Sequence, residues 1–150
     1  MRHLKQELFN RCLEFVDERI ASTENAINQA KDASQDDTKS SAGDKYETTR
    51  EMMQQEISRN EAQLHEAKKL KHALLQIPVN KTSNSVENGS IVSTTNGKFF
   101  IAISAGQITV EGKTYFVISS ASPIGRLMLG LKKGQKFSFN GKDFEIEGVE

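Results

Sequence analysis

The sequence predicts an α+β protein, in which an antiparallel coiled-coil hairpin of two long helices precedes a small antiparallel β domain with one short helix. Glycine and proline, which interrupt helices and strands, are unevenly distributed between the two halves of the chain. Residues 1–76 contain only Gly43, whereas residues 77–150 contain the other nine glycines and both prolines. Six of the eight phenylalanines also lie in the second half. Because Pro78 disfavours helix at the residue before it, we place the domain boundary there, with the hairpin over 1–76 and the β domain over 77–150.

Two apolar seams predict the helices of the first half. Apolar or small residues recur at alternating intervals of three and four, as at the a and d positions of a coiled coil. The first seam is Leu13, Val16, Ile20, Thr23, Ile27 and Ala30, and the second is Met53, Ile57, Asn60, Leu64 and Ala67, with Leu74 seven residues beyond Ala67. The polar stretch 34–43 predicts a loop between them. At ~1.5 Å per residue each helix is roughly 45–50 Å long. A dimer that uses the same seam between two chains is the alternative.

Short runs of β-branched and aromatic residues predict the strands of the second half. These runs are Ser90–Thr94, Lys98–Ser104, Gln107–Glu111, Thr114–Ser119, Gln135–Asn140 and Lys142–Glu147. Three dipeptides typical of hairpin turns lie between neighbouring runs. They are Asn96-Gly97, Glu111-Gly112 and Asn140-Gly141. The second half is therefore expected to form a small sheet of hairpins.

The segment 122–130 departs from this pattern and predicts a short helix. Ser122 suits the N-cap, Pro123 the first helical position, and Gly130 the end of the helix. The apolar residues expected to pack this helix on the sheet are Ile124, Leu127, Met128 and Leu131.

Composition and missing motifs exclude several functional classes. The 20 basic and 20 acidic residues balance, which excludes a nucleic-acid binder that works by bulk charge alone. A single cysteine, Cys12, excludes an intramolecular disulfide and a cysteine zinc site. The chain has no membrane-length apolar run and no secretory signal, so we expect a cytoplasmic protein without membrane contact. Phosphate-loop, dinucleotide-binding and nucleophile-elbow motifs are also missing, so a self-contained active site is not expected.

Acidic residues gather in and around the connection between the two predicted helices. The acidic residues of this segment are Asp32, Asp36, Asp37, Asp44 and Glu47, opposed by Lys39 and Lys45. Asp44 and Glu47 are three residues apart, so they share a face on the first turn of the second helix. There they can cap the helix and complement its dipole. Two carboxylates at this spacing also suit Mg²⁺, which prefers oxygen ligands.

Two motifs resemble those of the bacterial GreA/GreB transcript-cleavage factors. The stretch Ser122-Pro-Ile-Gly-Arg-Leu-Met-Leu-Gly-Leu-Lys-Lys-Gly-Gln, followed by a β-hairpin, resembles the C-terminal signature of that family. Gly43-Asp44-Lys45-Tyr46-Glu47 and the helix after it resemble the family's acidic tip. After Glu47 the family has Asn-Ala-Glu-Tyr, where this chain has Thr48-Thr49-Arg50-Glu51. The resemblance spans nearly the whole chain.

The resemblance implies a transcription elongation factor that assists an enzyme and is not one itself. The second domain would be FKBP-like and would dock on RNA polymerase at the mouth of its secondary channel. The partner-binding residues carried over are Ser122, Pro123, Ile124, Gly125 and Arg126. The hairpin would enter the channel, where Asp44 and Glu47 would help to hold a second Mg²⁺ and stimulate cleavage of backtracked RNA. The implied partners are RNA polymerase and its nascent RNA, the chain alone would hold no cofactor, and a monomer is expected.

Three other interpretations stay open at this point. Some relatives with very acidic tips occupy the channel without cleaving, and Asp36 and Asp37 make this tip more acidic than two residues require. An FKBP-like peptidyl-prolyl isomerase or chaperone with a helical arm is an alternative of another class, although no clustering of aromatic residues can be recognised in the sequence. The third alternative is a coiled-coil adaptor whose acidic loop serves only solubility.

Overall fold

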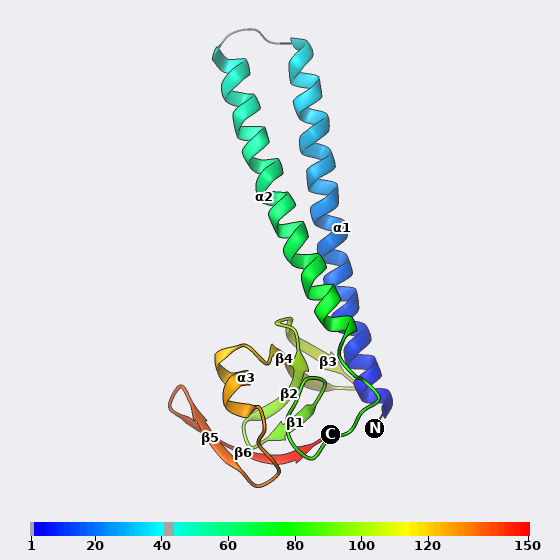
Figure 1. The fold of residues 1–150 in the computed structure, drawn as a ribbon, viewed down its shortest axis with the longest axis vertical. Coiled ribbons are helices and arrows are strands. Elements are labelled where there is room, and N and C mark those ends of the chain that lie inside the picture. The colour runs from blue at the N-terminus through cyan, green and yellow to red at the C-terminus, as the bar shows by residue number, and fades with distance from the viewer. Residues whose placement is uncertain (1, 41–43) are drawn as a thin grey trace. The chain divides into compact units, whose positions relative to one another are not determined.

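The computed structural model describes the backbone of residues 2–40 and 44–150 and the side chains of residues 3–33 and 48–150 (Figure 1). The chain forms two compact units. One, here called the β unit, joins Met1–Glu14 to Ala73–Glu150, and the other, the helical unit, is Phe15–His72. Helix α1 (Arg2–Ser40) and helix α2 (Asp44–Leu75) each contribute residues to both units.

The helical unit is an antiparallel helix pair held by the predicted seams. Its buried residues are Val16, Thr23, Ile27 and Ala30 on α1 and Ile57 and Ala67 on α2. Lys71, late in α2, places its Nζ atom 2.8 Å from Oδ1 of Asp17, early in α1. The buried hydroxyl of Thr23 donates to the Arg19 carbonyl oxygen at 2.8 Å, which satisfies it inside the seam. The two helices of one chain therefore cover each other.

The predicted loop over 34–43 is wrong for most of its length, because α1 continues through Ser40. Residues 41–43 lie outside the described part of the chain. No glycine or proline interrupts the sequence between Ala33 and Gly43. Serine, threonine and aspartate disfavour a helix by only about 0.5 kcal/mol each, and extending an existing helix is far easier than starting one. A polar composition alone was therefore too weak a signal for a helix end.

The β unit contains one six-stranded sheet in the order β3-β4-β2-β1-β6-β5 (Figure 1). Its strands are β1 (Ile91–Thr94), β2 (Gly97–Ala102), β3 (Gly106–Val110), β4 (Lys113–Ser119), β5 (Lys136–Phe139) and β6 (Lys142–Val149). Neighbouring strands are antiparallel except β2 and β4, which run parallel with Phe100 opposite Val117. The α+β fold class is confirmed, but a wholly antiparallel sheet is not. Strand β3 lies outside β4, so the β3–β4 hairpin returns β4 alongside β2 in the same direction.

Two of the three predicted turns form where the dipeptides indicate. Glu111-Gly112 and Asn140-Gly141 each have a first residue at φ 52° and a glycine at φ 77° or 78°, the left-handed conformation that two-residue hairpins require. The third turn lies one residue earlier than predicted. Thr94 pairs with Gly97, so the central residues are Thr95-Asn96, and the Asn96 N–H donates to Thr94 Oγ1 at 3.1 Å.

The core of the β unit lies between the sheet and the short helix α3 (Pro123–Met128). Its buried cluster consists of Val86, Val92, Phe99, Ile101, Met128, Phe144 and Ile146. Ile124 and Leu131 pack against this cluster as predicted, but Leu127 is 44% exposed. At about 100° per residue, Ile124 and Met128 share the inner face of α3, and Leu127 lies at the edge of that face, about 60° from Ile124. The prediction for Leu127 is therefore wrong.

The first turns of α1 complete the β unit. Leu8 and Cys12 are fully buried there, as is Leu74 near the end of α2. Burial raises the pKa of the Cys12 thiol to about 12, so the side chain acts as a small apolar residue and not as a nucleophile.

Among the described helices, none has a stretch long and apolar enough to cross a membrane.

Candidate functional site

The predicted acidic tip is described only as far as its backbone. Asp44 is the first residue of α2, and Glu47 lies in its first turn. The side chains of both residues, and of Asp36 and Asp37, lie outside the described part of the chain. Their pairing as metal ligands stays a prediction.

Ser122 caps helix α3 and explains how that helix begins. Ser122 has extended backbone angles, φ −67° and ψ 158°, and its Oγ accepts a hydrogen bond from the Gly125 N–H at 3.1 Å. The same hydroxyl donates to the Ser119 carbonyl oxygen at 2.6 Å. Pro123 occupies the first turn, where a missing N–H has no consequence. Ser122 is therefore engaged within its own domain, in agreement with the predicted N-cap.

Glycine is required at position 125 because the backbone of Ser119 lies very close to it. A Cβ atom at this position would lie 2.2 Å from the Ser119 carbonyl oxygen and 2.9 Å from Ser122 Oγ. A real Cβ cannot approach a backbone atom so closely, so any larger residue must displace the start of α3. Like Ser122, this motif residue serves the fold.

The outer side of α3 is the part of the motif left available to a partner. Pro123 and Arg126 are exposed, and among the described residues no carboxylate forms a salt bridge with Arg126. Leu127 is 44% exposed and Leu129 is 42% exposed. Pro123, Arg126, Leu127 and Leu129 are called the α3 outer face below. Of the five predicted partner-binding residues, only Pro123 and Arg126 belong to it.

Leu127 and Leu129 belong to this face, although the sequence did not predict them as partner-binding residues. A helical wheel places Leu127 at the edge of the face formed by Ile124 and Met128, which is a weak signal of exposure. The exposure of Leu129 had no comparable signal, because it follows the last residue of α3 and acts as the C-cap. Large apolar side chains that remain exposed next to a basic residue are typical of an interaction surface.

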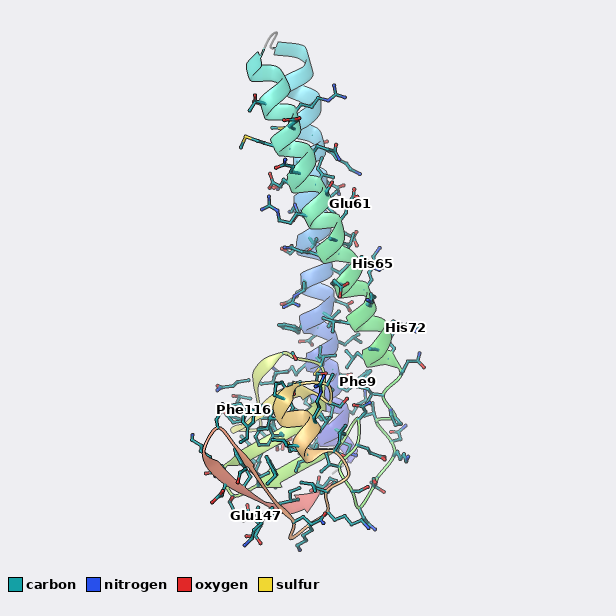
Figure 2. All side chains as sticks on the ribbon, turned by 60° about the vertical axis from the view of Figure 1, so that its left-hand side comes forward. Phe9, Glu61, His65, His72, Phe116 and Glu147 are labelled. Atoms are coloured by element: carbon teal, nitrogen blue, oxygen red, sulfur yellow. The ribbon has the colours of Figure 1, made fainter. Side chains whose placement is uncertain are left out.

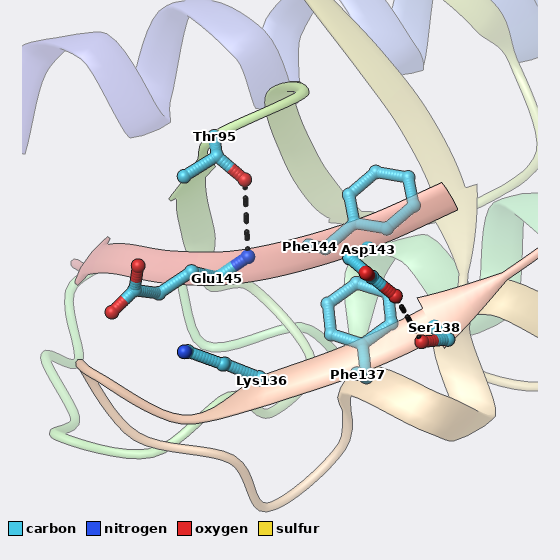
Figure 3. Close-up of a pocket in the computed structure, with 7 residues that line it drawn as sticks. All are labelled: Thr95, Lys136, Phe137, Ser138, Asp143, Phe144 and Glu145. Atoms are coloured by element: carbon cyan, nitrogen blue, oxygen red, sulfur yellow. Dashed lines mark hydrogen bonds between the residues drawn. The ribbon is translucent and has the colours of Figure 1, made fainter. Parts of the chain in front are cut away.

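A shallow pocket lies on the β5–β6 hairpin (Figure 3). It has a volume of about 490 Å³. Its lining residues are Thr95, Lys136, Phe137, Ser138, Asp143, Phe144 and Glu145. The Ser138 hydroxyl donates to Asp143 Oδ1 at 2.6 Å, and the Glu145 N–H donates to Thr95 Oγ1 at 3.1 Å. The first hydrogen bond joins β5 to β6, and the second joins β6 to the turn between β1 and β2.

The aromatic residues of this pocket bear on the isomerase alternative. Phe137 and Phe144 stack with ring centroids 4.8 Å apart and planes 5° apart. Phe144 also meets Phe99, which in turn meets Phe116, so aromatic clustering that the sequence does not reveal is present in the fold. Because the two stacked rings touch each other, a prolyl ring cannot enter between them.

Helix α2 carries two of the three histidines and offers no metal centre in its described part. Figure 2 shows Glu61, His65 and His72 along this exposed helix. Among the residues whose side chains are described, no group of three or more histidine, cysteine, aspartate or glutamate residues could hold a metal ion. The third histidine, His3, lies 3.6 Å from Glu111, with both side chains at least 70% exposed.

Comparisons with known proteins do not identify a family for this chain. No protein-family model and no curated protein sequence matches the chain. Among solved structures, the chain is similar to one described as that of the transcription factor Gfh1, with 18% identical residues over 91% of this chain and 92% of that chain, at a TM-score of 0.37. The functional interpretation therefore depends on the residues of this chain themselves.

Proposed function

We propose that this chain is an accessory factor of RNA polymerase that enters the secondary channel and promotes Mg²⁺-dependent cleavage of backtracked RNA. One observation carries the proposal: residues 122–135 and 43–47 resemble two separate signatures of transcript-cleavage factors, one in each half of the chain. The helix pair followed by a β unit agrees with this interpretation. The factor would act in the cytoplasm, where its polymerase works.

The proposed chemistry belongs to the polymerase and not to this chain. Hydrolysis of a phosphodiester by two metal ions needs one ion to activate water and one to stabilise the leaving oxygen. Asp44 and Glu47 are proposed to supply oxygen ligands to the ion that the polymerase holds poorly. Their position in the first turn of α2 supports this role.

The α3 outer face is proposed as the docking surface. Leu127 and Leu129 supply exposed apolar area, and Arg126 with the exposed residues Lys132 and Lys133 supplies positive charge along the same segment. An acidic surface with an apolar centre is the complementary partner chemistry. Docking through the β unit leaves the acids of the tip free for the polymerase.

Cleavage in a defined backtracked elongation complex tests the catalytic part. The wild-type chain with Mg²⁺ should shorten the RNA, and the double variant D44A/E47A should lose at least a hundredfold in rate while binding the polymerase with unchanged affinity. The matched control is E51A/E56A, which removes two exposed acids farther along the same helix and should cleave normally. Equal loss in both double variants would show that overall charge, and not the tip pair, is responsible.

Binding to core polymerase tests the docking surface separately. Leu127→Ser should weaken binding at least tenfold, because docking would bury the exposed apolar side chain of Leu127, whereas a serine hydroxyl buried there would lack a hydrogen-bond partner. Leu75→Ser is the control, since Leu75 is similarly exposed, at 53%, but lies at the end of α2. If the control weakens binding as much as Leu127→Ser, docking does not use the α3 outer face.

A non-cleaving regulator of the same channel is the second candidate. The additional acids Asp36 and Asp37, and the replacement of the usual Asn-Ala-Glu-Tyr by Thr48-Thr49-Arg50-Glu51, favour it. In the same assay, tight binding without cleavage, together with slower RNA extension, would establish this function in place of the first.

A further inference from the structure

A second cavity in the β unit contains the most deeply buried charged side chain among the described residues, Lys5. Its volume is about 210 Å³, roughly seven times the ~30 Å³ that one water molecule occupies in the liquid. The lining residues come from the first turns of α1, from the loop after α2, and from the end of β6. They are Lys5, Val79, Asn80, Thr82, Ser83, Asn84, Val149 and Glu150.

The Lys5 ammonium group is held by one hydrogen bond, which uses only one of its three donors. The residue is 5% exposed, and its Nζ donates one hydrogen bond, to the Lys81 carbonyl oxygen at 2.8 Å. An ammonium group has three donors, and a buried charge without a partner is costly. Within the described part of the chain, no carboxylate lies within ion-pair distance of Lys5. Burial lowers the pKa of Lys5, while the carboxylates of Glu150 and Glu87 oppose that shift.

Glu150 supplies the opposite charge to the same cavity. Its backbone is held in register, because its N–H donates to the Ile91 carbonyl oxygen at 2.9 Å and its own carbonyl oxygen accepts from the Ile91 N–H at 3.0 Å. Glu87, the other carboxylate near Lys5, is already paired with Lys81 at 3.3 Å. The cavity therefore has a cationic and an anionic wall that do not neutralise each other by contact.

We propose that this cavity binds a small zwitterion of the free amino acid class. The ligand carboxylate accepts from Lys5, and the ligand ammonium donates to Glu150. A simple anion is disfavoured because it would face Glu150, and a simple cation because it would face Lys5. The cavity volume restricts the side chain to a few heavy atoms, which is smaller than the drug-sized ligands of ordinary pockets.

Titration of the full-length chain, followed by amide chemical shifts, tests the proposal. The probes are glycine, alanine, 4-aminobutyrate, acetate and methylammonium, each alone. Glycine or alanine should shift the amides of residues 79–84 and 149–150 in a saturable manner, and acetate and methylammonium should bind at least tenfold more weakly. Preferential binding of 4-aminobutyrate would identify a zwitterion with more widely spaced charges and would also support the site.

Variants on each wall separate the site from a general effect. Lys5→Met keeps the length of the apolar stem and removes the charge, and Glu150→Gln keeps the shape and removes the opposite charge. Each should weaken amino acid binding at least tenfold. The controls Lys113→Met and Glu147→Gln change exposed residues of the same unit and should leave binding unchanged.

Two results would overturn the proposal. One is the absence of saturable shifts with every probe at 50 mM, which would mean that the cavity holds only water. The other is acetate binding as tightly as glycine, which would mean a plain anion site. If Lys5→Met fails to fold, Glu150→Gln and the probe series still decide the question. No polymerase enters these measurements, so their failure does not affect the proposed function.

Discussion

The β unit and the helical unit are stabilised in different ways. In the β unit, strands from distant parts of the sequence enclose a core whose central side chains, such as Ile101 and Met128, are fully buried. In the helical unit, burial follows one narrow stripe and includes residues as small as Ala30 and Ala67. A stripe between two helices stabilises a stiff pair but gives little room for an enclosed site. The hollow between the helices, about 580 Å³ and lined by residues such as Arg19, Arg59 and Leu70, is an open groove, whereas the smaller cavity at Lys5 in the β unit is more enclosed.

The strongest test of this difference is the substitution Gly125→Ala. The new Cβ would meet the Ser119 carbonyl oxygen at 2.2 Å, so the β unit should lose about 3 kcal/mol of unfolding free energy. Urea denaturation of the whole chain measures the loss. The control is Gly148→Ala, where a Cβ would meet nothing within 4 Å and stability should change little. Equal stability of the two variants would show that the Ser119 carbonyl oxygen does not lie too close to position 125 for a side chain.

Ile27→Ala tests the helical unit in the same terms. Ile27 is 6% exposed in the seam, and a buried Ile→Ala change removes 2–5 kcal/mol in general, so we expect a loss of about 2 kcal/mol. The low end applies because a narrow seam open on both sides can relax around the missing atoms. Helical circular dichroism during denaturation provides the measurement, and Asn28→Ala on the exposed side is the control. A loss as large as that of Gly125→Ala would remove the contrast between the units.

The buried thiol of the β unit makes stability depend on pH. The native pKa of Cys12 is about 12, whereas the ordinary value is 9.0. Above pH 9 the unfolded chain releases the thiol proton and the native chain does not, so stability falls as the pH rises from 9 toward 12. At pH 10 this contribution is about 1 kcal/mol. Denaturation at pH 7 and pH 10 should show a larger decrease for the wild type than for Cys12→Ala.

The smallest expected effect concerns the surface of the helical unit. The ion pair between Lys71 and Asp17 has side chains that are 39% and 48% exposed, so Asp17→Asn should cost only about 0.5 kcal/mol. The loss should decrease further in 1 M salt, because salt screens exposed charges. Glu18→Gln, at a neighbouring exposed position, serves as the control. An effect above about 2 kcal/mol would mean that the pair, and not the seam, holds the helices together.

Local features of the sequence predicted most of the fold. Alternation and turn dipeptides located all six strands to within about two residues, and Ser122 with Pro123 located the start of α3. The parallel pairing of β2 with β4 could not be predicted, because it depends on which edge β3 occupies and not on any local pattern. The extent of α1 was missed because polar residues continue a helix nearly as well as they end it.

The candidate sites were less predictable than the fold. The motif residues Ser122 and Gly125 matched a binding signature, but in the structure they are engaged in capping and close packing. Lys5 gave no signal in the sequence, where it resembles any solvated lysine near the start of a helix. Only the fold brings it to Lys81, which is 76 residues away, and to the end of β6. Asp44 and Glu47 stay predictions from sequence.

The order of the strands has a consequence for biosynthesis. Strand β6, the last of the chain, lies inside the sheet between β1 and β5. While the ribosome still holds β6 in its exit tunnel, β1 lacks one neighbour and β5 has none, so the sheet cannot close. The helix pair uses only residues that precede the sheet, so it can form earlier. The emerging polypeptide thus presents an open strand edge until β6 has left the ribosome, and during this interval it is most exposed to aggregation.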